Sequence, residues 1–243
     1  MRSRRSMSKP TKTDRKRVHT VIAFYVEKEQ QSLLSIFKNQ LLVALQESED
    51  LRKHIHSIKS RIKDPDHLRD KLIRKICQAR ENGEKFDIKP ENLFAKIGDL
   101  VGIRILHLYT HQFAEIDKAL REIFHNHKYR ISEGPFARTW DDESRDYFRG
   151  LRIKLQKSPT LYTSVHYLIE SASRAKVICE IQVRTLMEEV WGEVDHAINY
   201  PEPIDSIACR EQIKALARAT SSATRLVDSI FATVEDLERK RRP

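Results

Sequence analysis

Glycine is scarce in this sequence: there are six in 243 residues, and neither G-x-x-x-x-G-K-[ST] nor G-x-G-x-x-G occurs. A chain that holds phosphates without such loops must do so mainly with lysine and arginine side chains. The three cysteines, Cys77, Cys179 and Cys209, are far apart, and none belongs to a C-x-x-C pair. This pattern argues against a disulfide framework and a zinc site, and it indicates a reducing compartment, so we expect a cytoplasmic protein.

Long hydrophobic runs are also missing. No apolar stretch approaches the ~20 residues that a membrane helix needs, so we expect no membrane span. Residues 1–17 lack the apolar centre of a secretory signal. With 40% hydrophobic and 33% charged residues, the composition is that of a folded globular protein, and the length fits one large domain with helical appendages.

The net charge of +10 is concentrated at the two ends of the chain. Residues 1–17 carry +7 and residues 239–242 carry +4, so residues 18–238 sum to about −1. We therefore predict a basic, disordered tail over residues 1–17. Either these ends are simply solvated, or they attach weakly to RNA.

Hydrophobic periodicity predicts an α+β fold. Helical spacing covers residues 18–60, a segment after Pro65, and residues 111–125, 185–198 and 209–238. Strand patterns cover residues 101–108, 152–156, 164–169 and 177–185. Strands interleaved with helices predict a mixed β-sheet flanked by helices, with helical extensions at both ends.

Three of the predicted strands alternate with period two, so each has an apolar back and a polar front. In residues 177–185 the front carries Glu180, Gln182 and Arg184, and in residues 162–169 it carries Ser164 and His166. An ordinary solvated sheet face would also alternate. However, an imidazole, an amide and charges of both signs are unusual on such a face, and they favour a ligand site.

Two carboxylates occupy unusual positions. Asp99 directly precedes the most apolar strand, and Glu180 lies inside another strand. A carboxylate beside a buried strand is costly unless it is paired or metal-bound. Each could form an ion pair with Arg104 or Arg184. Alternatively, two such carboxylates on adjacent strands would suit Mg²⁺ together with nucleotide phosphates.

Five segments, in order, resemble the RelA/SpoT synthetase domain, specifically its short stand-alone branch. Residues 99–105 read D-L-V-G-I-R-I, residues 162–166 read Y-T-S-V-H, and residues 180–185 read E-I-Q-V-R-T. Residues 61–63 read R-I-K, with Lys71 beyond them, and residues 191–200 read W-G-E-V-D-H-A-I-N-Y, similar to the family's W-A-x-x-E-H-x-x-x-Y helix. The resemblance covers roughly residues 45–200 and implies a nucleotidyltransferase-like fold.

The resemblance implies pyrophosphate transfer from ATP to the 3′-hydroxyl of GDP or GTP, which makes the alarmone (p)ppGpp. It implies that Asp99 and Glu180 are the catalytic and Mg²⁺-binding residues, with Glu180 assisting the metal or acting as general base. The other implied roles are ATP binding and acceptor binding. For ATP the implied residues are Arg61, Lys63, Lys71 and Arg104, and for the acceptor they are Tyr162, His166, Gln182 and Arg145.

The sequence departs from the family on the acceptor side. The family reads K-x-N-G-Y before its stacking tyrosine, whereas residues 158–162 read S-P-T-L-Y, and residues 143–146 read E-S-R-D where the family has R-x-K-D or E-x-D-D. Two alternatives therefore stay open. One is a toxic family member that pyrophosphorylates the tRNA 3′-end, and the other is a catalytically silent nucleotide- or RNA-binding regulator.

The predicted organisation is a basic tail (1–17), a synthetase domain (18–204) and a C-terminal helical extension (205–243). The metal-dependent phosphohydrolase motifs of long family members do not occur, so we expect synthesis without degradation. The expected partners are ATP and a guanine nucleotide or the tRNA 3′-end. Homo-oligomer formation is also an expectation, as is an antitoxin if the protein is toxic.

Overall fold

The computed structural model describes residues 10–158, 161–199 and 204–241. Its centre is a six-stranded sheet in the order β1-β2-β6-β5-β3-β4. The strands are β1 (Ser57–Ile62), β2 (Val101–His107), β3 (Arg130–Thr139), β4 (Lys154–Lys157), β5 (Ser164–Glu170) and β6 (Ile178–Thr185). The β2–β6 and β3–β4 pairs are parallel and the others antiparallel, so the predicted mixed sheet is confirmed.

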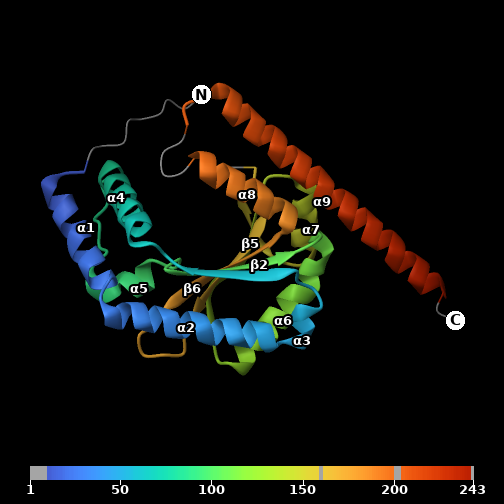
Figure 1. Cartoon of the computed structure of the whole chain (residues 1–243), viewed down its shortest axis with the longest axis horizontal. Coiled ribbons are helices and arrows are strands. Elements are labelled where there is room, and N and C mark those ends of the chain that lie inside the picture. Colours follow the sequence, from blue (N-terminus) through green and yellow to red (C-terminus); the bar gives the residue numbers. More distant parts are fainter. Residues whose placement is uncertain (1–9, 159–160, 200–203, 242–243) are drawn as a thin grey trace.

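Helices cover both faces of this sheet (Figure 1). α2 (Lys28–Glu47) and α6 (Phe113–Asn126) lie on one side, while α8 (Leu186–Asn199) and α9 (Ile207–Arg241) lie on the other. α1 (Lys12–Tyr25) packs against α4 (Pro65–Glu81) beside the β1 edge. The short helices are α3 (Glu49–Arg52), α5 (Leu93–Lys96), α7 (Asp142–Gly150), η1 (Pro90–Asn92) and η2 (Thr110–Gln112).

The main core lies on the α2/α6 side of the sheet. The back of β6 contributes Cys179, Ile181 and Val183, each at most 1% exposed. The strand register then places the polar residues of neighbouring strands in rows on the opposite face. One such row crosses all six strands in order and is polar except at Phe136: Lys59, Arg104, Gln182, His166, Phe136 and Lys154.

The prediction for the N-terminal part was wrong in two respects. The expected helix over residues 18–60 is divided into α1, α2 and α3, and its last part is strand β1. The predicted disordered tail ends earlier than residue 17, because α1 begins at Lys12. Its Asp14 is buried and forms an ion pair with Arg80 of α4. Residues 1–9 of that tail lie outside the described residues.

The remaining predicted elements are present, and further elements occur between them. The strand predicted at residues 152–156 starts at Lys154, because Arg152 has φ +58°, a left-handed conformation that interrupts an extended strand. β3 and α7 were not predicted. α7 nevertheless has a recognisable start, since Asp141 caps it by accepting from the Ser144 backbone N–H at 2.8 Å.

The last helix forms as predicted, but its apolar stripe does not face the core. Ile213 and Ala217 pack against Trp191 of α8. Farther along, the apolar side chains of α9 are exposed: Leu226, Ile230, Val234 and Leu237. The buried positions there are hydroxyls, namely Thr220, Ser221 and Thr224. None of the helices in the described ranges is long and apolar enough to cross a bilayer.

Candidate active site on the polar face of the sheet

A cavity of about 260 Å³ opens on the polar face, beside the β1 edge. β1 contributes Lys59 and Arg61 to its lining, β2 contributes Gly102 and Arg104, and β6 contributes Glu180 and Gln182. Asp99, Glu193 and His196 complete its charged and polar wall. Gly102 lies opposite Arg61 in the register and adds no side chain to the cavity wall.

Asp99 lies between two lysines at the start of β2. Its Oδ2 is 3.0 Å from Lys63 Nζ and its Oδ1 is 2.7 Å from Lys71 Nζ. Burial acts to raise the pKa of Asp99, but the two lysines outweigh it and hold this pKa below its ordinary value. Burial also lowers the pKa of Lys63, an effect that Asp99 only partly offsets. The predicted metal ligand and the two predicted phosphate-binding lysines therefore form one cluster.

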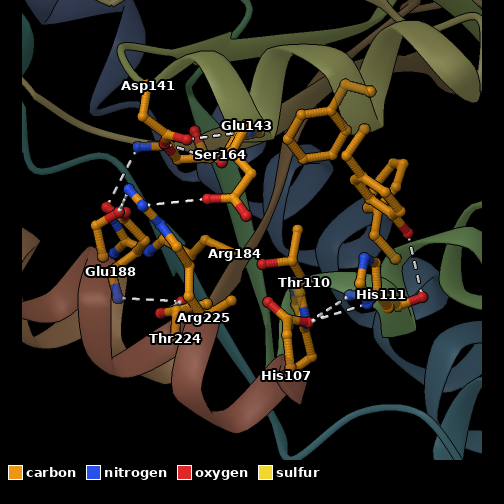
Figure 2. Close-up of a pocket in the computed structure, with 18 of the residues that line it drawn as sticks. His107, Thr110, His111, Asp141, Glu143, Ser164, Arg184, Glu188, Thr224 and Arg225 are labelled. Carbon is orange, nitrogen blue, oxygen red and sulfur yellow. Dashed lines mark hydrogen bonds and ion pairs between the residues drawn. The ribbon is translucent and has the colours of Figure 1, made fainter. Parts of the chain in front are cut away.

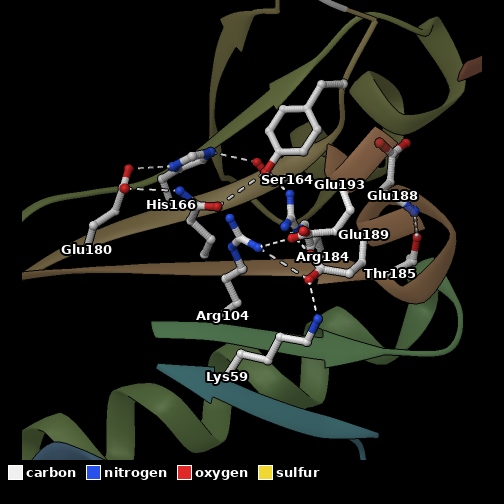
Figure 3. A network of polar contacts seen from close by, with 12 residues as sticks. Lys59, Arg104, Ser164, His166, Glu180, Arg184, Thr185, Glu188, Glu189 and Glu193 are labelled. Atoms are coloured by element: carbon white, nitrogen blue, oxygen red, sulfur yellow. Dashed lines mark hydrogen bonds and ion pairs between the residues drawn. The ribbon is translucent and has the colours of Figure 1, made fainter. Parts of the chain in front are cut away.

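A second cluster anchors Arg104 against α8 (Figure 3). Arg104 Nη1 lies 3.3 Å from Glu189 Oε1 and 2.5 Å from Glu193 Oε1. The same Glu189 accepts from Lys59 at 2.8 Å and pairs with Arg184. Its side chain is only 7% exposed, so it is a buried carboxylate shared by three cations. This sharing fixes the position of Arg104 at the cavity wall.

Glu180 belongs to a hydrogen-bonded chain that runs across the polar face (Figure 3). Its Oε1 is 3.0 Å from His166 Nδ1, and His166 Nε2 is 2.6 Å from Ser164 Oγ. Burial lowers the pKa of His166, so the ring is neutral, and a proton on Nδ1 satisfies both contacts. Burial acts to raise the pKa of Glu180, but the hydrogen bonds from His166 and Gln182 hold it below its ordinary value. Glu180 is therefore an ionised, oriented carboxylate.

Tyr162 lies at the far end of this face. Its hydroxyl donates to Gln182 Oε1 at 3.4 Å and accepts from Arg184 Nη1 at 3.2 Å. Its ring contacts Trp191, with centroids 5.8 Å apart and planes 28° apart, and the Arg184 guanidinium lies over it at 5.6 Å. Trp191 is 4% exposed and is therefore a core residue.

Gly192 makes room for this arrangement. A Cβ at this position of α8 would lie 2.9 Å from Arg184 Nη1, which is too close for an undisturbed side chain. The glycine stands where the family helix has alanine. Arg184 can therefore reach both Tyr162 and Glu189 without a steric conflict.

The structure brings together all but one of the predicted site residues. Arg61, Asp99, Arg104, Glu180 and Gln182 line the cavity itself. Lys63 and Lys71 join it through Asp99, and His166 and Tyr162 join it through Glu180 and Gln182. Arg145 is the exception. It lies on α7, pairs with Asp142 and donates to the Trp140 carbonyl at 2.7 Å.

Of the two alternatives for the carboxylates, the ion pair of Asp99 or Glu180 with Arg104 or Arg184 does not occur. Asp99 pairs with the lysines, and the two arginines pair with carboxylates of α8. Sequence reasoning also missed Lys59, Glu189 and Glu193. Lys59 precedes Arg61 by two positions and therefore lies on the same face of β1. This strand pattern was not recognised because residues 18–60 were predicted to be helical.

Comparisons with known proteins identify the family and a similar fold. Residues 60–205 match the family model described as the region found in RelA / SpoT proteins. A GTP pyrophosphokinase family protein from Streptococcus pneumoniae superposes with a TM-score of 0.56 at 17% identity, covering 87% of this chain and 94% of that one. The small alarmone synthetase 1 from Bacillus subtilis, in a structure bound to its product pppGpp, gives 0.55 at 16% identity, covering 87% and 96%. No curated protein matches the sequence.

Proposed function

Since this chain belongs to the RelA/SpoT family, we propose that it is a pyrophosphokinase that makes (p)ppGpp and that the polar face of its sheet is the active site. In this reaction the 3′-hydroxyl oxygen of the acceptor bonds to the β-phosphorus of ATP. The bond between the α,β-bridging oxygen and that phosphorus breaks, and AMP leaves. The observation that carries the proposal is the joint placement of Asp99, its two lysines and Glu180 around one cavity.

The donor nucleotide fits the β1/β2 side of this cavity. Arg61 and Arg104 present two guanidinium groups from neighbouring strands, and such planes stack on a purine. Glu189 and Glu193 hold Arg104 in place before ATP arrives. Lys63 and Lys71 would exchange part of their pairing with Asp99 for the phosphates, which supplies the charge that a glycine-poor chain cannot provide through its backbone.

The residues present also fit a magnesium ion. Asp99 Oδ1 is buried and accepts no well-directed hydrogen bond, although Lys71 lies beside it, so this oxygen has coordination capacity to spare. Carboxylate oxygens are the ligands that Mg²⁺ prefers, and the ion keeps several waters and substrate phosphates. Asp99 and Glu180 would hold the metal, which would neutralise charge on the phosphates during transfer.

The chain of Ser164, His166 and Glu180 orients the catalytic carboxylate. Since the pKa of Glu180 lies below its ordinary value, it is a weak base and a good partner for a cation. Neutral His166 fixes the Glu180 carboxylate through Nδ1 and is itself fixed by Ser164. Catalysis then rests on positioning and charge neutralisation, as in phosphoryl transfer generally.

The acceptor is proposed to be GDP or GTP, bound near Tyr162, His166 and Gln182. The near-neutral charge of residues 18–238 offers no broad basic surface for tRNA. Incubation of the protein with labelled ATP, Mg²⁺ and, separately, GDP, GTP or deacylated tRNA tests this choice. Label transferred only to tRNA would replace the nucleotide acceptor with tRNA. No transfer to any of the three would support a silent regulator.

Removing the Arg61 guanidinium should weaken ATP binding. We expect Arg61→Ala to raise the KM for ATP roughly tenfold, because a desolvated cation–π contact is worth about 1–2 kcal/mol. Arg61→Lys should rescue poorly, since an ammonium lacks the plane. Steady-state kinetics with varied ATP would measure both. Arg69→Ala, which removes an arginine paired with Asp66 on the surface of α4, serves as the control. Full rescue by lysine would make Arg61 a phosphate contact instead.

Loss of the Tyr162 ring should affect the acceptor and leave ATP unchanged. We expect Tyr162→Ala to raise the KM for GDP about tenfold or more, because stacking of a base on an aromatic ring contributes about 1–3 kcal/mol. Tyr162→Phe keeps the ring and loses only the contacts of the hydroxyl with Gln182 and Arg184. Its KM for GDP should therefore stay close to that of the wild type. Equal losses in both variants would assign the effect to the hydroxyl.

A further inference from the structure

A second cavity of about 260 Å³ lies where α9 crosses the end of the sheet (Figure 2). The ends of β2 and β6, the start of β5, and helices α7, α8 and α9 all contribute to it. Among the described residues, none lines both this cavity and the one that holds Asp99 and Glu180. It is therefore distinct from that cavity, although Ser164 in its lining is hydrogen-bonded to His166.

The cavity exists because α9 turns small polar side chains toward the sheet. Ser221 and Thr224 are 7% and 6% exposed, and Asp228 is on the same side of the helix. Short hydroxyl side chains cannot fill the space as leucine or isoleucine would. Leu226, Ile230 and Val234 of this part of α9 are exposed instead, whereas Phe231 stacks on Tyr109. The result is a lined space between helix and sheet rather than a packed interface.

The charges on its wall favour a cation. Glu143 pairs with Arg225 at 3.1 Å, and Asp228 lies 3.5 Å from His111. Arg184 also lines the cavity, and its guanidinium hydrogen-bonds the Tyr162 hydroxyl and pairs with Glu189. The wall therefore carries four carboxyl groups, those of Asp141, Glu143, Glu188 and Asp228, against two arginines. Among the described residues no ion pair involves Asp141 or Glu188, so the wall favours a cation over a phosphate or other anion.

Glu188 is a deeply buried carboxyl group of this wall. It is 5% exposed, and its Oε2 accepts from the Thr163 backbone N–H at 3.2 Å. Within the described ranges its Oε1 has no hydrogen-bond partner. Burial raises the pKa of Glu188 to about 7, because ionisation without a counter-charge is costly in this place. A bound cation would remove that cost.

Two further features define the rest of the ligand. His107 is buried, and with its Nδ1 donating to the Tyr109 carbonyl at 2.9 Å, its Nε2 remains an acceptor for an N–H group. The opposite wall is apolar and formed by Phe113, Phe148 and Val165. Such a wall suits a short hydrocarbon chain better than a hydrated metal ion.

We propose that this cavity binds a small organic cation, an ammonium or guanidinium group on a short hydrocarbon chain, with Glu188 as its counter-ion. Glu188 contacts the charged end, and the aromatic wall contacts the chain. This site shares no lining residue with the cavity that holds Asp99 and Glu180, so binding of the cation does not require the proposed reaction.

The test compares n-butylamine with 1-butanol, which has the same carbon chain and no charge, by ligand-observed NMR on the full-length protein. We expect n-butylamine to bind and 1-butanol to bind at least about tenfold more weakly, as the loss of a buried charge pair predicts. Glu188→Gln should weaken n-butylamine binding by a similar factor. Asp146→Asn, which removes an exposed carboxylate of α7, should leave it unchanged.

A second variant tests the proposal independently, in case Glu188→Gln does not fold. Thr224→Met fills part of the cavity from α9 without a change of charge, and it should also abolish n-butylamine binding while thermal unfolding stays cooperative. Equal binding of 1-butanol, or unchanged binding by a folded Glu188→Gln, would overturn the proposal. Displacement of n-butylamine by an equal concentration of Mg²⁺ would also overturn it, by making the cavity a metal site.

Discussion

Asp99→Asn is expected to reduce pyrophosphate transfer by about a thousandfold or more. Loss of a metal ligand removes several kcal/mol of transition-state stabilisation, and each ~1.4 kcal/mol changes the rate tenfold. Asn keeps the shape of the side chain but not the charge that balances Lys63 and Lys71. The measurement is turnover of labelled ATP with GDP or GTP, together with circular dichroism to confirm that the variant is folded.

A matched control separates this effect from the loss of any ion-paired aspartate. Asp142 also pairs with a basic side chain, Arg145, but its side chain is 90% exposed on α7 and outside the cavity. Asp142→Asn should therefore retain transfer close to that of the wild type. Turnover by folded Asp99→Asn within tenfold of the wild-type value would remove Asp99 from the catalytic machinery.

The second large effect concerns stability and comes from Glu188. Burial raises its pKa from 4.5 to about 7 in the folded protein. The folded state therefore binds a proton that the unfolded state releases near pH 4.5, so stability falls as the pH rises from about 4.5 to 7. The full loss is about 3 kcal/mol in the free energy of unfolding, at about 1.4 kcal/mol per pKa unit.

Glu188→Gln cannot ionise and should not lose stability in this way. Urea unfolding at about pH 5 and pH 8 would compare the variant with the wild type in the absence of amines. We expect the free energy of unfolding of the variant, minus that of the wild type, to be roughly 3 kcal/mol larger at about pH 8 than at about pH 5. Glu143→Gln, which changes a carboxylate of the same wall that is 71% exposed, serves as the control. If the stability of Glu188→Gln and of the wild type changed with pH in the same way, Glu188 would not be the source of the pH dependence.

Local sequence patterns predicted much of the candidate site. Period-two alternation in residues 164–169 and 177–185 assigned Ser164, His166, Glu180 and Gln182 to one face, and the structure confirms it. This succeeds because the alternation of side chains along a strand is a property of the local backbone. The resemblance to the RelA/SpoT domain, confirmed by the match over residues 60–205, predicted the activity. Hydrophobic periodicity indicates secondary structure but not activity.

The pairing of charges could not be predicted in the same way. Sequence neighbours suggested Arg104 or Arg184 for Asp99, whereas the partners are Lys63 and Lys71, placed there by the β1–β2 pairing and by α4. Glu189 pairs with three cationic side chains only because α8 packs over β2 and β6. Such contacts join residues that are far apart in the chain, so they depend on strand order and helix packing.

The sequence by itself determined the strands with clear alternation, the amphipathic helices and the chemical class of the site. The tertiary structure decided which faces are covered. Residues 57–62 became a strand because β2 offered a pairing edge, which overrode a helix-like local pattern. α9 exposes its apolar stripe and turns hydroxyls toward the sheet, because its contact with Trp191 of α8 fixes its rotation. That rotation, which periodicity alone cannot specify, created the second cavity.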